Sequence, residues 1–456
     1  MSTSATSVNP ATGETLATYP YHSETETESI LQRAADTFPR HRAASFAERA
    51  RMMNRVADLL DERKQSLGEL MTREMGKPLA QAVAEAQKCA WVCRYYAEHA
   101  EAQLADEPVE TEATKSVIAY QPLGLILAVM PWNFPLWQAF RFAAPNVMAG
   151  NVGILKHASN VQSCAHAMED LFREAGFGAG VFQNLLVPHD RFEDVIADAR
   201  VRGVTLTGSE AAGRAIAAAA GQHLKPTVLE LGGSDPFLVL ADADLDRAVE
   251  IGVNARVQNN GQSCIAAKRF IVEASVAEAF TERFVRAFES LAVGNPMDDG
   301  TDVGPMARED LRDEVHDQVE RAVADGAEIL TGGKKLDRAG FYYAPTVLGN
   351  VQRGTVAFEE EIFGPVASVI VAADLDEAVD LANDTHFGLG GAVFTEVRAK
   401  GEAVARRLEC GCAFVNQLVK SHPHLPFGGV KDSGYGRELS GLGIREFVNA
   451  KTLWVE

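Results

Sequence analysis

The sequence predicts an α/β protein with at least two lobes, and three observations support this fold class. The chain has 456 residues, which is too long for one hydrophobic core of ordinary size. Hydrophobic residues make up 46% of the chain, as in compact globular proteins. Short apolar stretches alternate with stretches of helical periodicity, and this alternation is typical of parallel β-α-β units.

The N-terminal part is predicted to be helical. From about Glu28 to Gln103, apolar residues recur every three or four positions, so that each helix has one apolar face. The sequence Gly76-Lys77-Pro78 separates two of these helices, because glycine favours the conformation that follows a helix and proline cannot continue one.

Strands and helices alternate in the next part of the chain. Helices are expected at about Val161–Ala175 and Glu210–Ala220, and apolar strands at 116–131, 152–157, 181–187, 203–209 and 227–233. A second series of strands and helices runs from about residue 236 to 418. The second lobe is therefore expected to begin near Gly232 and Gly233, which leaves a cleft between the lobes, a preferred place for small-molecule sites.

Composition excludes several classes of protein. The formal net charge of -20 argues against general nucleic-acid binding and against docking on anionic membranes. No run reaches the ~18 apolar residues of a membrane span, and the N-terminus has no basic stretch followed by an apolar one, so no signal or transit peptide is expected. The six cysteines lack redox or zinc spacing, and no metal site is predicted. We expect a cytoplasmic protein with reduced thiols.

Two short motifs fit either a ligand site or an ordinary turn. In "TLTGSEAAGRAI", Gly208 and Ser209 lie between a strand and a helix, where free N–H groups can bind a phosphate or Ser209 can simply cap the helix. In "PWNFP", Asn133 is held between prolines, which suits a rigid catalytic amide donor but also a rigid turn.

Two further residues have unusual surroundings. Glu230 stands alone at the end of an apolar strand, and a buried carboxylate is usually paired, protonated or functional. Cys264 would by itself be read as an inert buried thiol. Its polar, turn-prone neighbours "NNGQS" and a helix expected to end near Val257 instead favour an exposed thiolate stabilised at a helix terminus.

Taken in order, the motifs resemble those of the aldehyde dehydrogenase superfamily over essentially the full chain, and look closest to bacterial succinate semialdehyde dehydrogenases. The motifs are "PWNFP", Lys156, "TGS", "ELGG", "GQSC", "EEIFGP" and "PFGGVKDSGYGRE". The resemblance implies two Rossmann-like lobes and a strand-based oligomerisation element in a homodimer or homotetramer. On this chain the dinucleotide-binding domain would span 1–105 and 125–232, the catalytic domain 233–446, and the oligomerisation element 106–124 and 447–456.

The resemblance also implies a mechanism. Cys264 would attack the aldehyde carbonyl, and the side-chain amide of Asn133 and the Cys264 N–H would hold the resulting oxyanion. Hydride would pass to a nicotinamide, leaving a thioester. Glu230 would activate the water that hydrolyses this thioester, and Glu438 would relay protons toward that water.

The same resemblance nominates residues that bind the cofactor, which are Trp132, Lys156, Ser159, Gly208, Ser209, Glu361 and Phe363. Many NAD-preferring relatives carry a glutamate at the position of Ser159. A carboxylate would repel a 2'-phosphate, whereas serine can donate a hydrogen bond to it, with Lys156 and His157 nearby. NADP is therefore expected to be accepted, and NAD remains open.

The substrate is expected to be succinate semialdehyde or a similar short ω-carboxy aldehyde such as glutarate semialdehyde. Arg141 is nominated to bind the distal carboxylate, although a lone arginine on a helix more often forms a structural ion pair. Gln258 and Ser421 are nominated beside it, with Lys420 and His422 as further candidates. The alternatives are a broad-specificity enzyme, a CoA-acylating enzyme, against which Glu230 argues, and an inactive binding protein.

Overall fold

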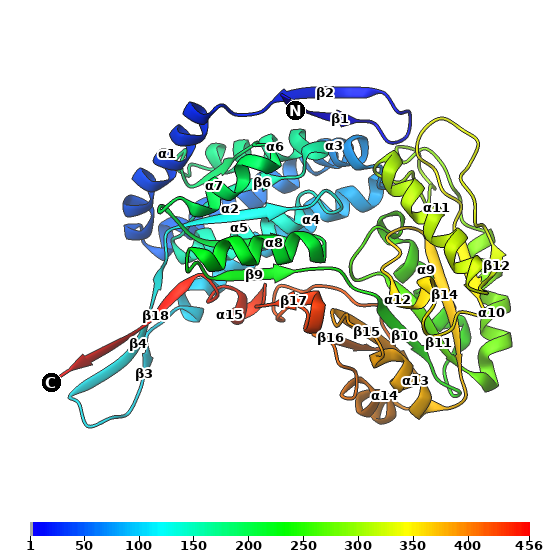
Figure 1. The fold of residues 1–456 in the computed structure, drawn as a ribbon. Helices are drawn as coiled ribbons and strands as arrows, with labels where there is room; N and C mark the ends of the chain where they lie inside the picture. The colour runs from blue at the N-terminus through cyan, green and yellow to red at the C-terminus, as the bar shows by residue number, and fades with distance from the viewer. Residues whose placement is uncertain (1–2) are drawn as a thin grey trace.

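The computed structural model describes residues 3–456 and contains two large parallel-type sheets, each covered by helices (Figure 1). The first has six strands in the order β17-β9-β8-β5-β6-β7. Strands β5 to β9 are parallel, and only β17 is antiparallel to its neighbour β9. Their bounds are β5 Leu125–Met130, β6 Val152–His157, β7 Phe182–Asn184, β8 Val201–Thr207, β9 Thr227–Glu230 and β17 Gly434–Tyr435.

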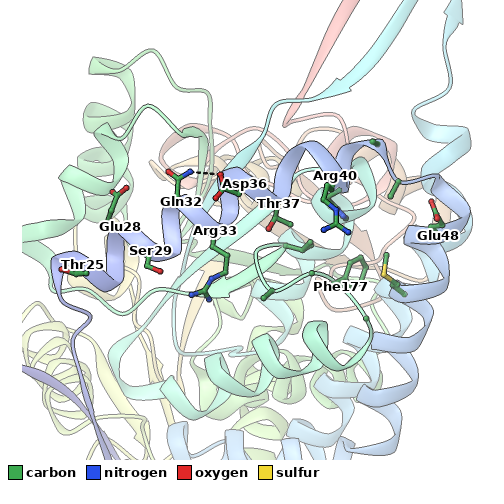
Figure 2. Close-up of a pocket in the computed structure, with 18 residues that line it drawn as sticks. Thr25, Glu28, Ser29, Gln32, Arg33, Asp36, Thr37, Arg40, Glu48 and Phe177 are labelled. Atoms are coloured by element: carbon green, nitrogen blue, oxygen red, sulfur yellow. Dashed lines mark hydrogen bonds between the residues drawn. The ribbon is translucent and has the colours of Figure 1, made fainter.

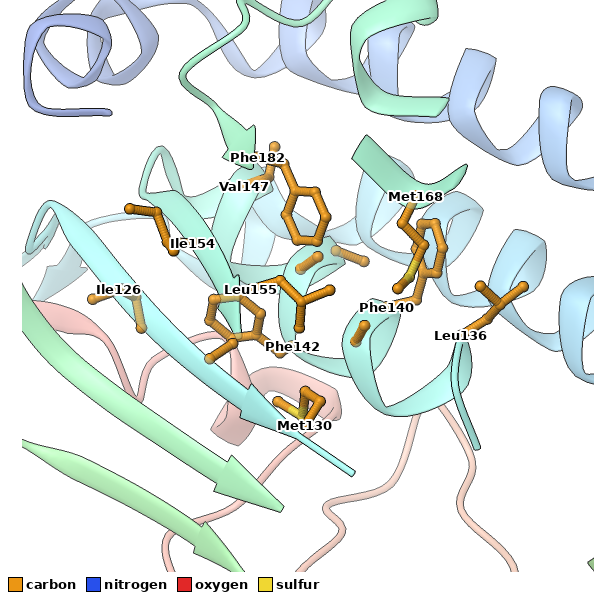
Figure 3. Packing of buried hydrophobic residues seen from close by; sticks show 14 of the residues in the cluster. Ile126, Met130, Leu136, Phe140, Phe142, Val147, Ile154, Leu155, Met168 and Phe182 are labelled. Atoms are coloured by element: carbon orange, nitrogen blue, oxygen red, sulfur yellow. The ribbon is translucent and has the colours of Figure 1, made fainter. Parts of the chain in front are cut away.

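The helices of this part lie close to their predicted positions. They are α1 Glu24–Ala43, α2 Phe46–Glu62, α3 Lys64–Met75, α4 Leu79–Gln103, α5 Trp137–Ala149, α6 Gln162–Glu174, α7 Phe192–Ala197 and α8 Glu210–Gln222. Helix α3 ends at Gly76, which has a left-handed φ of 83°, as the Gly-Lys-Pro sequence predicts. Large apolar side chains of α5, α6 and the strands pack together, among them Phe140, Met168 and Leu155 (Figure 3). Phe140 also stacks on Phe172, with 5.7 Å between ring centroids.

The second sheet has seven strands in the order β12-β13-β14-β11-β10-β15-β16. The strands are β10 Asp235–Val239, β11 Ala267–Glu273, β12 Glu328–Thr331, β13 Thr346–Gly349, β14 Val366–Ala372, β15 Gly390–Phe394 and β16 Cys412–Val415. The helices are α9 Leu245–Val257, α10 Ala274–Glu289, α11 Glu309–Ala324, α12 Val356–Glu359, α13 Leu375–Asn383 and α14 Arg398–Ala405, and α15 Ser440–Gly443 follows. The predicted α/β fold class is confirmed.

A three-stranded sheet projects from the body of the molecule (Figure 1). It consists of β3 Glu107–Pro108, β4 Lys115–Pro122 and β18 Val448–Val455, with β4 in the middle and antiparallel to both neighbours. These strands lie within the two segments that were predicted to form an oligomerisation element. In β18, Leu453, Trp454 and Val455 are 37%, 46% and 50% exposed.

Two features were not expected from the sequence. A hairpin of β1 Ser4–Val8 and β2 Thr15–Pro20 packs on the body, where the buried Ser7 hydroxyl contacts Glu74 at 3.0 Å and the Asn160 carbonyl at 2.9 Å. Its strands consist mainly of small and polar residues, so they carry no apolar alternation. Strand β17 lies inside the predicted catalytic segment 233–446 but pairs with β9 of the other sheet. The domain boundaries therefore remain a prediction. Strand β17 departs from them, because it lies in the predicted catalytic segment but joins the six-stranded sheet.

A cavity of about 1240 Å³ lies between α1 and the Gly176–Val181 segment. Figure 2 shows Glu28, Arg33, Asp36 and Arg40 along one side of it. None of the predicted site residues lines this cavity. Within residues 3–456, no helix combines the length and apolar character needed to cross a membrane.

Candidate active site

The site lies at the carboxyl ends of the parallel strands of the six-stranded sheet. Asn133 follows β5, Lys156 is near the end of β6, Ser209 follows β8, and Glu230 is the last residue of β9. The carboxyl ends of parallel strands meet at one edge, and the chain order reverses at β5, which has β6 on one side and β8 on the other. The order of the strands therefore places these residues, which the sequence motifs had nominated, at the same edge of the sheet.

The segment before Cys264 is a tight reversal built from left-handed residues. After α9, Asn259, Asn260 and Gly261 have φ values of 58°, 58° and 75°. Asparagine tolerates this conformation, and glycine is needed at the third position because a methyl group there would lie 2.4 Å from the Gly364 carbonyl carbon. The sequence "NNG" is therefore the turn that brings Cys264 to the first sheet.

Asn133 packs against this reversal. Its side-chain Nδ2 donates to the Gln262 carbonyl at 3.1 Å, and its own carbonyl accepts from Asn259 Nδ2 at 2.8 Å. Asn133 is only 3% exposed. The predicted amide donor is thus held rigidly beside the segment that carries Cys264.

A buried arginine fastens the reversal to the segment of Glu361 and Phe363. The Arg256 guanidinium donates to the carbonyls of Ile362 at 2.8 Å and Gly261 at 3.3 Å. It also donates to the carbonyls of Gly364 and Val366. Burial lowers the pKa of Arg256 to about 9, which leaves it charged at neutral pH.

Lys268 forms a second link that sequence analysis did not find. Its Nζ donates to the Ser263 carbonyl at 2.9 Å and the Cys264 carbonyl at 2.8 Å, and pairs with Glu361 Oε1 at 3.1 Å. The only available signal was a lysine inside an apolar strand, four residues after Cys264. Lys268 therefore couples the position of Cys264 to that of Glu361.

The Cys264 thiol is partly exposed, but its surroundings do not stabilise a thiolate. Burial raises the pKa of Cys264 to about 12, and the charges of Lys268 and Arg141 only partly oppose this effect. The expectation of a thiolate stabilised at a helix terminus is wrong, because the nearby terminus of α9 is its carboxyl end, which presents carbonyl groups. At neutral pH Cys264 is a thiol and needs a base.

Glu230 is the residue that was predicted to act as a base. It is 2% exposed, and neither of its carboxylate oxygens has a hydrogen-bond partner among the described residues. Burial, followed by the charge of Glu438, raises the pKa of Glu230 well above its usual range. A methyl group at Gly428 would lie 2.7 Å from Glu230 Oε1, so glycine is needed for this close approach.

Glu438 and Arg141 form a buried ion pair. Arg141 also contacts the Thr207 hydroxyl at 3.4 Å and stacks on the Phe427 ring, 4.7 Å from its centroid. Burial raises the pKa of Glu438, and Arg141 opposes that shift. The guanidinium nominated for the substrate carboxylate is therefore already held by a carboxylate of the protein, and its substrate role stays a prediction.

The predicted cofactor residues form two groups. In the first, Gly233 N–H donates to Glu361 Oε1 at 3.1 Å, and the rings of Trp132 and Phe363 meet edge to face at 5.9 Å. A methyl group on Gly232 would lie 2.5 Å from Glu361 Oε2. Glycine is therefore needed at position 232, because a side chain there would collide with the Glu361 carboxylate.

The second group consists of Lys156, Ser159, Gly208 and Ser209. This lysine is 9% exposed and has no hydrogen bond or ion pair within residues 3–456, and burial lowers its pKa. Ser159 is exposed nearby in the chain. Ser209, next to Gly208, caps α8 by accepting from Ala212 N–H at 3.4 Å. Lys156 without a partner among the described residues, and the N-terminus of α8 with its free N–H groups, each suit an anionic ligand.

The suggested contribution of His157 to phosphate binding is wrong. His157 is fully buried, and its ring nitrogens face the Pro135 carbonyl at 2.9 Å and the Met130 carbonyl at 3.1 Å. Burial lowers its pKa to about 4, so it is neutral. The strand alternation turns His157 into the core. His189, whose pKa is lowered chiefly by the charge of Lys156, is instead the exposed histidine near that lysine.

Two of the three residues nominated for substrate binding, Gln258 and Ser421, lie at a cavity of about 280 Å³ between α4 and α5, which we call the α4–α5 cavity; Arg141 does not line it. Gln258 lines it together with Gln81, Lys88, Phe134, Trp137 and Asn259. Ser421 adjoins it by accepting from Lys88 Nζ at 2.8 Å and from Trp137 Nε1 at 3.1 Å. Lys88 was missed because it lies in a long amphipathic helix, where a lysine usually faces solvent.

Comparisons with known proteins agree with this arrangement. Residues 1–453 match the aldehyde dehydrogenase family. A probable succinate-semialdehyde dehydrogenase (NADP(+)) of Synechocystis sp. is 53% identical over 448 residues, covering 98% of this chain and 99% of that protein. Succinate-semialdehyde dehydrogenase (NADP(+)) 1 of Mycobacterium tuberculosis H37Rv is 54% identical over 451 residues, with 98% and 99% covered.

The solved structures lead to the same conclusion. The crystal structure of succinic semialdehyde dehydrogenase from Streptococcus pyogenes in complex with NADP+ has a TM-score of 0.97 at 39% identity, with 99% of each chain covered. A parallel-sheet fold with a cysteine, an amide and a buried carboxylate at one strand edge defines a class of aldehyde-oxidising enzymes. This chain belongs to the aldehyde dehydrogenase family, which confirms the resemblance inferred from the motifs.

We expect alkylation of Cys264 by iodoacetamide to be slow at neutral pH and to accelerate about tenfold per pH unit from about pH 6 to about pH 9. The reason is its raised pKa of about 12, because only the thiolate reacts and its fraction grows tenfold per unit below the pKa. Mass spectrometry of the modified cysteine peptide would measure the rate, with Cys264→Ser as the control. A fast rate that does not change over this range would contradict the assignment.

Proposed function

We propose that this enzyme oxidises succinate semialdehyde, or a similar short ω-carboxy aldehyde, to the dicarboxylic acid with NADP as the cofactor. The relatives at 53% and 54% identity carry this activity and cofactor in their names, and the match covers nearly the whole of each chain. The observation that supports the proposal is that Asn133 and Glu230 lie at the carboxyl edge of one sheet, that Asn133 is hydrogen-bonded to the segment that carries Cys264, and that Lys156 and Lys88 have no ion-pair partner among the described residues. Such lysines suit an anionic cofactor and an anionic aldehyde.

The residues present fit a dinucleotide. Lys156 has no acceptor among the described residues, α8 is capped by Ser209, and Gly232 lets the Glu361 carboxylate lie close to the backbone. We propose that Lys156, Ser159, Gly208 and Ser209 hold the adenosine and phosphate end, and that Glu361, Phe363 and Trp132 hold the nicotinamide end. When bound, the cofactor supplies a hydride acceptor.

The chain supplies the remaining chemistry. We propose that Glu230 takes the Cys264 proton, so that the sulfur attacks the aldehyde carbonyl. The Asn133 amide and the Cys264 N–H would donate to the oxyanion. After oxidation to the thioester, Glu230 would deprotonate a water that attacks the carbonyl carbon and releases Cys264 as the thiol. Glu438 would carry the proton away from Glu230.

The raised pKa values of Glu230 and Cys264 predict the direction in which the turnover rate changes with pH. A base works only when unprotonated, and its raised pKa makes the active fraction grow as pH increases. The turnover rate is therefore expected to rise from neutral to mildly alkaline pH. Hydrolysis by Glu230 also argues for release of the free acid and against transfer to CoA.

The direct test is an aldehyde panel with both cofactors. We expect NADPH formation with succinate semialdehyde at a higher kcat/KM than with butanal, and a fall of at least about 1000-fold in Cys264→Ala, because the nucleophile is lost. Absorbance at the reduced nicotinamide band measures the rate, and chromatography identifies succinate. No turnover of any ω-carboxy aldehyde by the wild-type enzyme would overturn the proposal.

The cofactor choice is tested at Ser159. We expect Ser159→Glu to lower kcat/KM for NADP by about 10- to 100-fold, because a carboxylate would repel the 2'-phosphate, while the value for NAD is kept or improved. Ser159→Gln, which adds size without charge, serves as the matched control. An equal loss with both cofactors in Ser159→Glu would show a packing defect instead of charge selection.

We further propose that the three-stranded sheet joins subunits into a homodimer or homotetramer in the cytoplasm. Strand β18 is an edge strand within the described chain, and its unpaired backbone groups and exposed Trp454 suit pairing with another subunit. All six cysteines are free, which fits a reducing compartment.

The assembly is tested by changing β18. We expect Trp454→Glu to lower the molecular mass in solution by half or more, because it buries a charge in the proposed contact. Analytical ultracentrifugation measures the mass. Leu224→Glu is the control, since Leu224 is 93% exposed on the body of the molecule. An unchanged mass in Trp454→Glu would count against this interface.

A further inference from the structure

The junction of α3 with α4, together with the first turns of α4, contacts both segments proposed to bind the oxyanion. We call this stretch, residues 76–85, the α3–α4 corner. The Gly76 carbonyl accepts from Asn260 Nδ2 at 2.8 Å. Gln81 Oε1 accepts from the Asn259 N–H at 2.7 Å. Because both asparagines belong to the left-handed reversal before the nucleophile, the corner fixes one of the two segments.

The same corner contacts the other segment, that of Asn133, through a buried ion pair. Lys77 pairs with Glu85, and the two residues are 1% and 5% exposed. Lys77 Nζ also lies 4.2 Å from the centre of the Phe134 ring, which a cation over an aromatic face stabilises. Phe134 directly follows Asn133, so the ammonium group holds the backbone next to the predicted amide donor.

Glu85 supplies the cap that α5 lacks. The side chain of Leu136, the residue before this helix, cannot accept a hydrogen bond, so the first N–H groups need an acceptor from elsewhere. Glu85 Oε1 accepts from the N–H groups of Leu136 and Trp137, each at 2.9 Å. A carboxylate is also the favourable charge at a helix N-terminus. The start of α5, shortly after Asn133, is therefore tied to α4.

Stability alone does not account for a charged pair at this position. Apolar side chains of similar volume often stabilise a buried contact as well as an ion pair does. An apolar pair would, however, leave the first N–H groups of α5 without an acceptor and the Phe134 ring without a cation on its face. The two charges thus act on either side of a single short segment, the one that carries Asn133.

We propose that Lys77 and Glu85 are positioning residues for Asn133, and that they set its side-chain amide relative to the Cys264 N–H. The inference rests on the proposed mechanism, because it concerns the two donors assigned to the oxyanion. A donor stabilises the transition state only if it points to the place where negative charge develops. A small displacement of Asn133 therefore slows the reaction while substrate and cofactor still bind.

The first test separates kcat from KM. In Lys77→Met we expect kcat to fall about 10- to 100-fold, while KM for the aldehyde and for NADP stays within about threefold, because only the oxyanion donor is displaced. Steady-state kinetics measures both, with the aldehyde that the wild type oxidises fastest. Alkylation of Cys264 by iodoacetamide needs the thiolate but no oxyanion donor, so its rate should stay within about threefold.

Glu85→Gln and Glu74→Gln are matched variants, because each replaces a buried carboxylate that caps a neighbouring helix. Glu74 accepts from the N–H groups of Ser163 and Cys164 at the start of α6, at 2.9 and 3.1 Å. Glu85→Gln leaves Lys77 without its partner and should lower kcat as Lys77→Met does. Glu74→Gln should keep kcat within about threefold, because α6 carries none of the residues proposed for the reaction.

A combined variant guards against a failure to fold. A single substitution leaves one charge of the pair buried without its partner, which is strongly destabilising, whereas Lys77→Met with Glu85→Gln removes both charges. If a single variant does not fold, the combined variant replaces it. The same fall in kcat is expected, with the same alkylation rate of Cys264.

A double-mutant cycle shows whether the pair acts through Asn133. Asn133→Ala should lower kcat about 100- to 1000-fold, as expected for the loss of an oxyanion donor. In that background Lys77→Met should change kcat by less than about threefold, because the group that it positions is gone. An equal fall of kcat with and without Asn133 would overturn the inference.

The remaining outcomes distinguish the inference from the mechanism on which it rests. If Asn133→Ala leaves kcat unchanged, the proposed mechanism fails and the inference fails with it. If Asn133→Ala lowers kcat but neither Lys77→Met nor the combined variant does, the mechanism stands and the inference alone is overturned. If the alkylation rate of Cys264 falls together with kcat, the pair acts on the nucleophile, which also overturns the inference.

Discussion

The geometry of the site depends on one buried guanidinium, that of Arg256. It holds carbonyl groups from two segments far apart in the chain, the reversal before Cys264 and the stretch that follows Glu361. No neutral side chain offers five N–H donors in one plane. Without it, four buried carbonyl groups would lose a donor, at a cost of about 1–3 kcal/mol for each one left unsatisfied. The positions of Cys264 and Glu361 are therefore fixed by the same group, and Lys268 reinforces that link.

The predicted base Glu230 shares a buried environment with a second carboxylate and one guanidinium. Glu230 and Glu438 are both buried, and only Arg141 is paired with them, through Glu438. Burial raises the pKa of Glu230 well above its usual range, and the charge of Glu438, which Arg141 only partly compensates, adds to this shift. A more basic carboxylate is what a thiol with a pKa of about 12 requires as a partner. The high pKa of the nucleophile and that of the base are thus two results of the same burial.

Local sequence patterns predicted much of the fold and part of the site. The sequence segments of helices α6 and α8 and of strands β5 to β9 have clear periodicity. Asn133, Glu230 and Ser209 could be predicted to lie together because they follow or end parallel strands, whose carboxyl ends meet at one edge of a sheet. What could not be predicted depends on contacts between distant segments. Strand β17 is two residues long and is defined only by its pairing with β9. The raised pKa of Cys264 comes from burial that no local pattern shows, and the ion pair of Arg141 joins α5 to a loop almost three hundred residues later, at Glu438.

The buried and partly buried lysines differ in whether they have an ion-pair partner. Lys77 and Lys268 each pair with a glutamate, Glu85 and Glu361. Lys88 and Lys156 have no such partner within residues 3–456, although the chain carries an excess of 20 negative charges from which a partner could have been drawn. Removing a cation from water without compensation is costly, so a fold that retains two such groups has a use for them. Lys156 lies near the end of β6, at the strand edge proposed to bind the phosphates of the cofactor, and Lys88 lines the α4–α5 cavity. In the proposed complex Lys156 meets the anionic part of the cofactor, so the partner that is missing from the free protein arrives with the ligand.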